Sequence, residues 1–145
     1  MHNLYANFIK ILEVCKHFAQ DLVNNKGNLT RLGVVPKFSN LEVIALSLTA
    51  ETMGIDSESY LFGKLEEYRK QMPNLISRRQ YNDRRKLTAQ LCEKIRKRIV
   101  EAIDGGVDYF IIDTRIISKV SALTVSQYLN KINNRPIGRI KYALA

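Results

Sequence analysis

The sequence has no acidic residue after Asp113, no tryptophan, only two cysteines and only three prolines. Every one of the 32 residues from Thr114 to Ala145 is uncharged or basic. A divalent metal site needs several converging carboxylates, so one that begins at Asp113 finds no further acid downstream. Cys15 and Cys92 have no second cysteine or histidine at metal-ligand spacing, and their apolar surroundings predict reduced core thiols.

Long apolar runs are also missing from the sequence. No stretch approaches the ~20 apolar residues of a membrane helix. The N-terminus lacks the short apolar segment and small-residue cleavage site of a secretion signal. We therefore expect no membrane association and a cytoplasmic location. The 145 residues, of which 46% are hydrophobic, have room for one domain or for one domain and an incomplete second.

The net charge of +9 is concentrated in one segment. Residues 1–68 carry six basic and eight acidic side chains, whereas residues 69–98 carry eleven basic and two acidic ones. Such a concentration of cations indicates a surface that faces a polyanion, most simply the phosphate backbone of a nucleic acid. The alternative is a solvated helix face with an uneven charge.

The spacing of apolar residues predicts a mainly α fold, in which an N-terminal helical bundle occupies residues 1–104. The expected helices run over 4–24, from the cap Ser39 to the stop at Gly54, from a cap at Asp56 or Ser57 to a point before Met72, and from the cap Ser77 to Gly105. Two of these starts have the spacing of a capping box, formed by Ser39 with Glu42 and by Ser77 with Gln80.

The C-terminal part, residues 105–145, is predicted to form a second unit. The apolar run from Val107 to Ile112 indicates a buried strand that ends in Asp113. An amphipathic helix is expected to follow from Ile116 to Ile132, with these residues on its apolar side: Ile117, Val120, Leu123, Val125, Tyr128, Leu129 and Ile132.

The basic helix start from Ser77 to Lys86 is the strongest functional signal. Two compact helices and a short turn are expected before it, which is typical of a recognition helix in a helix-turn-helix unit. Four residues are of the types that read base edges: Arg78, Arg79, Gln80 and Asn82. Three more are suited to phosphates: Arg84, Arg85 and Lys86. Four further cations either contact the phosphate backbone of a nucleic acid or form a solvated helix face: Lys94, Arg96, Lys97 and Arg98.

Three phrases resemble the N-terminal part of bacterial insertion-sequence transposases of the DDE type: Leu41 to Glu51, Gly54 to Glu58, and Leu75 to Arg85. The likeness covers roughly residues 1–113. It implies a helical DNA-binding region that leads into an RNase H-like core, whose first strand ends in the aspartate matched by Asp113. Residues 114–137 resemble the extreme C-terminus of such a transposase.

The resemblance implies a truncated transposase. An intact member would hold Mg²⁺ on three carboxylates for phosphoryl transfer. Here the second aspartate and the final glutamate are missing, so Asp113 would be a vestigial first catalytic and metal-binding carboxylate. No cofactor is then expected in this chain. Our hypothesis is an in-frame internal deletion that joins the two ends near Asp113 and Thr114.

The expected partner is double-stranded DNA at the terminal inverted repeats of a parent element, bound without strand cleavage. A second copy or an intact transposase is a further candidate partner. Two alternatives stay open from the sequence. One is a helix-turn-helix regulator unrelated to transposition. The other is a non-functional, decaying product whose C-terminal apolar residues have no core to cover them.

Overall fold

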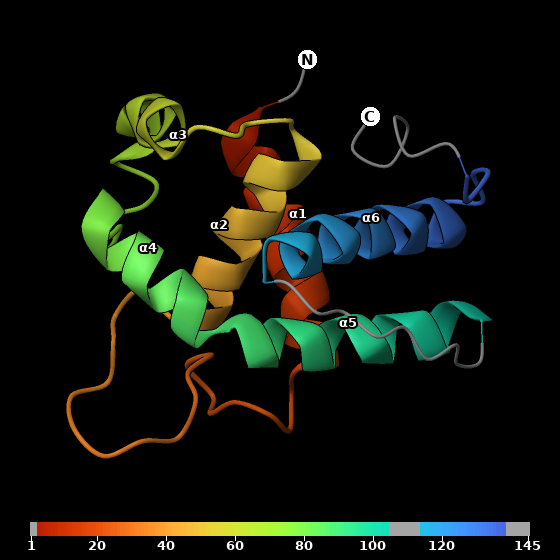
Figure 1. Ribbon diagram of the computed structural model, residues 1–145, viewed down its shortest axis with the longest axis horizontal. Coiled ribbons are helices and arrows are strands. Elements are labelled where there is room, and N and C mark those ends of the chain that lie inside the picture. The colour runs from red at the N-terminus through yellow and green to blue at the C-terminus, as the bar shows by residue number, and fades with distance from the viewer. Residues whose placement is uncertain (1–2, 105–113, 139–145) are drawn as a thin grey trace.

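A computed structural model of the chain describes residues 3–104 and 114–138. Within these ranges it contains six α-helices, one short 3-10 turn and no strand, which confirms the mainly α fold (Figure 1). The elements are α1 (Leu4–Phe18), α2 (Asn40–Thr52), α3 (Glu58–Leu65), η1 (Glu66–Tyr68), α4 (Arg78–Leu87), α5 (Ala89–Asp104) and α6 (Thr114–Ile132). The predicted strand and Asp113 lie outside the described residues.

Helix α2 is the central element of the fold. Residues 43–50 are all buried, because α1, α4 and α6 pack around this helix (Figure 1). The Ser39 hydroxyl accepts a hydrogen bond from the Glu42 amide at 3.1 Å, and the Glu42 carboxylate accepts one from the Ser39 amide at 2.6 Å. Gly54 follows the helix with a φ of 69°. Both the predicted capping box and the predicted glycine stop are confirmed.

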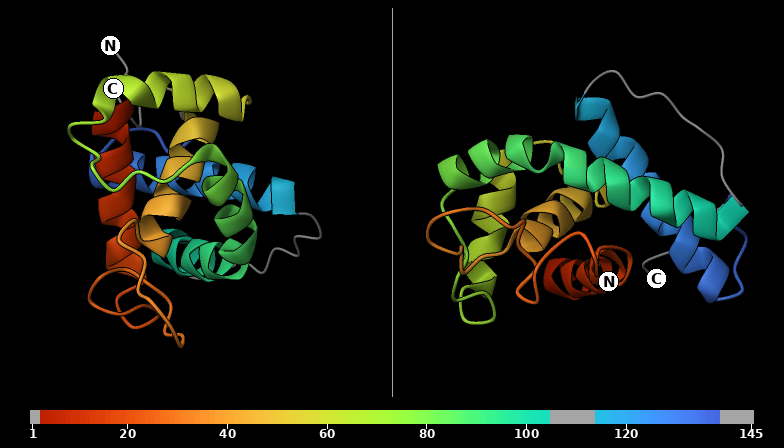
Figure 2. Two further views of the ribbon diagram at one scale, coloured as in Figure 1. Left: turned by 90° about the vertical axis from the view of Figure 1, so that its left-hand side faces the viewer. Right: turned by 90° about the horizontal axis from the view of Figure 1, so that it is seen from below.

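Helices α1, α5 and α6 complete a core around α2. Helix α6 crosses α5 and also packs on α2 (Figures 1 and 2). The buried residues that these three helices contribute include Phe8, Ile11, Leu12, Cys15, Leu91, Ile95, Ile99, Ala122, Val125 and Leu129. The helix expected in the C-terminal unit therefore shares a core with the N-terminal helices.

The apolar side predicted for α6 is confirmed in part. Val125 and Leu129 are buried, and Val120 and Tyr128 are half-buried. Leu123 and Ile132, in contrast, are 37% and 55% exposed. Small and polar residues occupy the remaining buried positions, namely Ser121, Ala122, Thr124, Ser126 and Asn130. The side chain of Ile117 lies outside the described residues.

The first helix ends earlier than predicted, at Phe18 instead of at residue 24. The Arg98 guanidinium donates a 2.9 Å hydrogen bond to the Phe18 carbonyl oxygen, and it also binds the Asp21 carboxylate. A cation at the C-terminus of a helix satisfies carbonyl groups that have no partner within the helix. The long-range contact with α5 therefore fixes the end of α1, and a turn over Ala19–Leu22 follows.

The prediction of one long helix from Ser77 to Gly105 is wrong, because Thr88 separates α4 from α5. The Thr88 hydroxyl donates to the carbonyl oxygens of Arg84 at 3.0 Å and Arg85 at 3.1 Å, a contact that bends helices. Thr88 is buried, whereas the preceding residue, Leu87, is 71% exposed.

Ser57, one of the two predicted caps, begins α3 by accepting a 3.2 Å hydrogen bond from the Tyr60 amide. The connection from α3 to α4 contains η1 and residues 69–77. It is longer than the three or four residues that join the helices of a helix-turn-helix. That unit stays a prediction.

Candidate nucleic-acid interface

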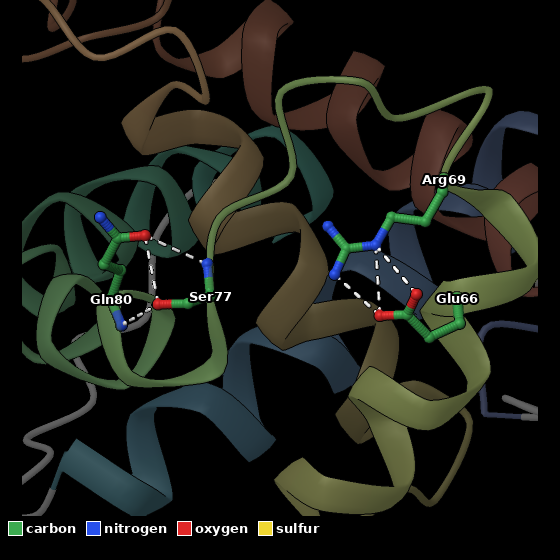
Figure 3. A network of polar contacts seen from close by, with 4 residues as sticks. All are labelled: Glu66, Arg69, Ser77 and Gln80. Atoms are coloured by element: carbon green, nitrogen blue, oxygen red, sulfur yellow. Dashed lines mark hydrogen bonds and ion pairs between the residues drawn. The ribbon is translucent and has the colours of Figure 1, made fainter.

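Helix α4 begins with the predicted capping box (Figure 3). The backbone N–H of Gln80 donates to the Ser77 hydroxyl at 3.2 Å, and the side-chain oxygen of Gln80 accepts from the backbone N–H of Ser77 at 3.1 Å. The carbonyl oxygen of the Gln80 side chain thus holds the helix start together. The same oxygen also accepts from the Ser77 hydroxyl at 3.2 Å, so for base contacts Gln80 retains only the donors of its side-chain NH2 group.

Tyr81 fixes the side of α4 that faces the core. It is 1% exposed, and its ring lies 5.4 Å from that of Phe62, measured between centroids. Burial raises the pKa of Tyr81, and a hydrogen bond with Ser47 partly opposes that rise. Residues three and four positions after Tyr81 share its face of the helix. Arg84 and Arg85 therefore lie at the inner side of α4.

Arg84 fastens α4 to the beginning of α2. Its guanidinium donates to the Phe38 carbonyl oxygen at 2.6 Å and to the Asn40 side-chain oxygen at 2.8 Å. Burial lowers the pKa of Arg84, and the nearby positive charge of Arg31 lowers it further. The phosphate contact predicted for Arg84 would compete with these two hydrogen bonds.

Two other arginines connect α4 to α3. Arg85 forms an ion pair with Glu58 at 3.1 Å, and its guanidinium carbon lies 5.8 Å from the centre of the Tyr81 ring. Arg78 is exposed and donates one hydrogen bond to the Ser59 hydroxyl. An arginine side chain carries five N–H donors, so Arg78 keeps donors for an external ligand.

Three of the predicted residues form an outward stripe along α4. Arg79, Asn82 and Lys86 follow one another at steps of three and four, which places them on one side of the helix. Arg79 and Lys86 are exposed, and Asn82 is half-buried. No side-chain hydrogen bond or ion pair joins any of them to another residue within 3–104 and 114–138. We call these three residues the α4 stripe.

Acidic residues from outside the 69–98 segment neutralise part of its charge. Arg69 pairs with Glu66 at 2.7 Å (Figure 3), and Arg98 pairs with Asp21. The hydrogen bond from Arg98 is the main cause that lowers the pKa of Asp21 to about 2. In the described part of the chain, the exposed cations of this segment without an acidic partner are Lys70, Arg78, Arg79, Lys86, Lys94 and Lys97.

The four cations predicted on the later part of the basic helix divide into two kinds. Lys94 and Lys97 are exposed on α5. Arg96 is 1% exposed and pairs with Glu93 at 2.7 Å, while Arg98 binds Phe18 and Asp21. Lys94 and Lys97 are therefore available to a polyanion, whereas Arg96 and Arg98 already bind residues of the fold.

A cleft of about 450 Å³ lies beside α4, between α2, α3 and α6. Its charged side chains largely pair with one another. Lys119 on α6 binds Glu51 at 2.9 Å and Asp56 at 3.6 Å, and Arg85 binds Glu58. Asn82 and Lys86 are among the residues that line the cleft, so two of the three residues of the α4 stripe border it.

The described residues contain no group of three His, Cys, Asp or Glu side chains that could hold a metal ion. Asp113, the predicted metal and catalytic residue, lies outside them.

Cys15 and Cys92 are both free and buried, as predicted, and burial raises the pKa of each thiol. Within 3–104 and 114–138, no helix has both the length and the apolar character of a membrane span.

The sequence contained a signal for the inner role of Arg84 and Arg85. Tyr81, Thr88 and Cys92 follow one another at steps of seven and four, as residues on one face of a helix do, and Arg84 and Arg85 lie three and four positions after Tyr81. The sequence analysis did not single out Arg31 and Lys37, which lie in the loop before α2.

Comparisons of the chain with protein-family models, curated proteins and solved structures find no match.

Proposed function

We propose that this protein binds duplex DNA through the α4 stripe and acts as a truncated insertion-sequence transposase that recognises transposon ends. The stripe carries the proposal: two exposed cations and an amide side chain share one side of a helix. Arginine and asparagine are residue types that contact bases and phosphates. The further exposed cations Lys94 and Lys97 on α5 would add to the attraction for a phosphate backbone.

The position of α4 supports an outward binding role. Tyr81 anchors the helix in the core, while Arg84 and Arg85 tie it to α2 and α3. These contacts hold the stripe in a fixed orientation before any ligand binds. A rigid contact surface loses less conformational entropy on binding than a mobile one.

The assignment to a transposase rests on the sequence phrases of α2 and α4. Binding without cleavage rests on the absence of acidic residues after Asp113. In this proposal the protein occupies the ends of a parent element and competes there with the intact enzyme.

The test is binding of the full chain to duplexes that carry the terminal inverted repeats of the parent element. Fluorescence anisotropy would compare these duplexes with scrambled ones of equal composition and with the promoter region of the gene. We expect preference for the inverted repeats and no strand cleavage after Mg²⁺ is added. Preference for the promoter would favour a regulator instead, and no preference would remove the claim of end recognition.

A further inference from the structure

The loop of residues 29–37, between α1 and α2, has a firmly held base. Asn28 is 1% exposed, and its side chain connects both ends of the loop. It donates to the Pro36 carbonyl oxygen at 3.1 Å and accepts from the Asn40 amide at 3.0 Å. The Asn24 side-chain oxygen in turn accepts from the Asn28 amide at 3.0 Å. A loop closed in this way presents its tip as a defined feature of the surface.

The tip of the 29–37 loop is apolar and open to solvent. Leu32 is 101% exposed and Val34 is 88% exposed, while Leu29 and Val35 are 37% and 45% exposed. Between Leu32 and Val34, Gly33 has a φ of 108° and no heavy atom near the position of a Cβ. Single exposed aliphatic residues are common, but four in one short loop indicate a surface that contacts another molecule.

The electrostatics of this loop favour a polyanion as that molecule. No acidic residue occurs in the 20 positions between Asp21 and Glu42, which include Lys26, Arg31 and Lys37. Arg31 and Lys37 are exposed at the two sides of the apolar tip. A second copy of the chain would bring a like-charged loop against this one, which costs free energy.

The loop also lies beside α4, on the side of the helix that carries Arg84 and not on the side of the α4 stripe, so a duplex that contacts both must lie across the helix. Arg84 binds Phe38 and Asn40, which directly follow the loop, so its base is fastened to α4. The charge of Arg31 reaches Arg84 and lowers the pKa of Arg84. Figure 1 and the right-hand view of Figure 2 show the loop, in orange, on the side of the molecule where α4 lies.

We propose that the 29–37 loop is a second contact to the duplex that the α4 stripe binds, with Arg31 and Lys37 on phosphates and Leu32 and Val34 in a groove. This inference rests on the proposed function. Aliphatic side chains contact thymine methyl groups in the major groove or wedge between base steps in the minor groove. A two-residue tip suits such a contact, whereas a stable protein dimer buries about 800 Å² on each partner.

The test is the salt dependence of duplex binding by the full chain, measured by fluorescence anisotropy. The slope of log K against log salt is negative, and each lost phosphate contact reduces its magnitude by about 0.9. The double variant Arg31→Ala/Lys37→Ala should therefore reduce the magnitude of the slope by about 1.8. The matched control Lys10→Ala/Lys16→Ala removes two exposed charges from α1 and should leave the slope unchanged. The charge-preserving variant Arg31→Lys/Lys37→Arg should also keep it.

A second variant tests the apolar tip. Leu32→Ser/Val34→Ser alters two exposed side chains, so the melting temperature should not change, while duplex affinity should fall several-fold at an unchanged salt slope. An unaltered slope in Arg31→Ala/Lys37→Ala, or an unchanged duplex affinity in the tip variant, would overturn the inference. If the wild-type chain and the α4 variants show no duplex binding, the proposed function itself fails.

Discussion

The Arg84 guanidinium donates a 2.8 Å hydrogen bond to the side-chain oxygen of Asn40, 44 positions earlier in the chain. Asn40 is the first residue of α2, and Arg84 also binds the carbonyl oxygen of Phe38. This pair of contacts joins three features: the candidate DNA helix, the central helix and the base of the 29–37 loop. Arg84 therefore links these elements within the fold, and it is not part of the α4 stripe, which lies on another side of the same helix.

Replacement of Arg84 by alanine should lower the free energy of unfolding by about 1.5–3 kcal/mol, because the hydrogen bonds of a half-buried charged group are lost. Chemical denaturation with urea would measure the change. Arg79→Ala is the matched control, since Arg79 is exposed and should change stability by no more than about 0.5 kcal/mol. Equal effects of the two substitutions would contradict the linking role of Arg84.

Replacement of Gln80 by glutamate should separate stability from DNA affinity. Glutamate preserves the capping box with Ser77 and adds a negative charge near the start of α4, which stabilises a helix by about 0.3–1 kcal/mol. The same charge should repel phosphates and weaken duplex binding. Thermal melting and anisotropy on one preparation would test both effects. An unchanged affinity would place the duplex away from this end of α4.

Acid should weaken the contact between α1 and α5. The hydrogen bond from Arg98 lowers the pKa of Asp21 from its usual 3.8 to about 2, so the folded state binds this proton less readily than the unfolded state does. The stabilising effect is present above pH 3.8 and is lost as the pH falls through 2.

Urea denaturation across this acid range would compare the wild type with Asp21→Asn. The variant should show a smaller fall in stability toward low pH. Glu67→Gln, at another exposed carboxylate, is the control and should follow the wild type. A constant difference between Asp21→Asn and the wild type at every pH would argue against the ion pair as the cause.

Alkali should weaken the core through its two thiols. Burial raises the pKa of Cys92 from 9.0 to about 11 and raises that of Cys15 as well. The folded state thus favours the neutral thiols, and their contribution to stability is complete below pH 9 and is lost as the pH rises through 11.

Alkylation followed by mass spectrometry gives a direct check. Buried, protonated thiols react slowly, so iodoacetamide at neutral pH should label neither cysteine in the folded protein and both in urea. Fast labelling of Cys92 without denaturant would show that α5 and α6 separate readily, because the Cys92 sulfur contacts the Ser121 hydroxyl between these helices.

Local features of the fold were predictable from the sequence, and the long-range ones were not. The caps at Ser39 and Ser77 and the stop at Gly54 depend on residues within one turn, and all three were confirmed. The break at Thr88 and the early end of α1 were missed. Thr88 is buried in the interior of the fold, and the end of α1 depends on Arg98, 80 positions away from Phe18.

The candidate interface shows the same division. Composition identified the basic segment, but it could not show that Glu58, Glu66 and Asp21 pair with three of its arginines. Glu58 and Asp21 lie far from their partners in the sequence, so these two contacts depend on the tertiary fold, whereas Glu66 lies only three residues before Arg69. The helix period around Tyr81, in contrast, already separates the α4 stripe from Arg84 and Arg85.

The salt dependence of duplex binding by Arg79→Ala/Lys86→Ala tests the central claim most directly. If the α4 stripe contacts the phosphate backbone at both cations, the magnitude of the negative slope of log K against log salt should decrease by about 1.8 relative to the wild type. Lys10→Ala/Lys16→Ala, with the same change in net charge, should retain the wild-type slope. Equal slopes for all three proteins, or no duplex binding by the wild type, would contradict DNA recognition through α4.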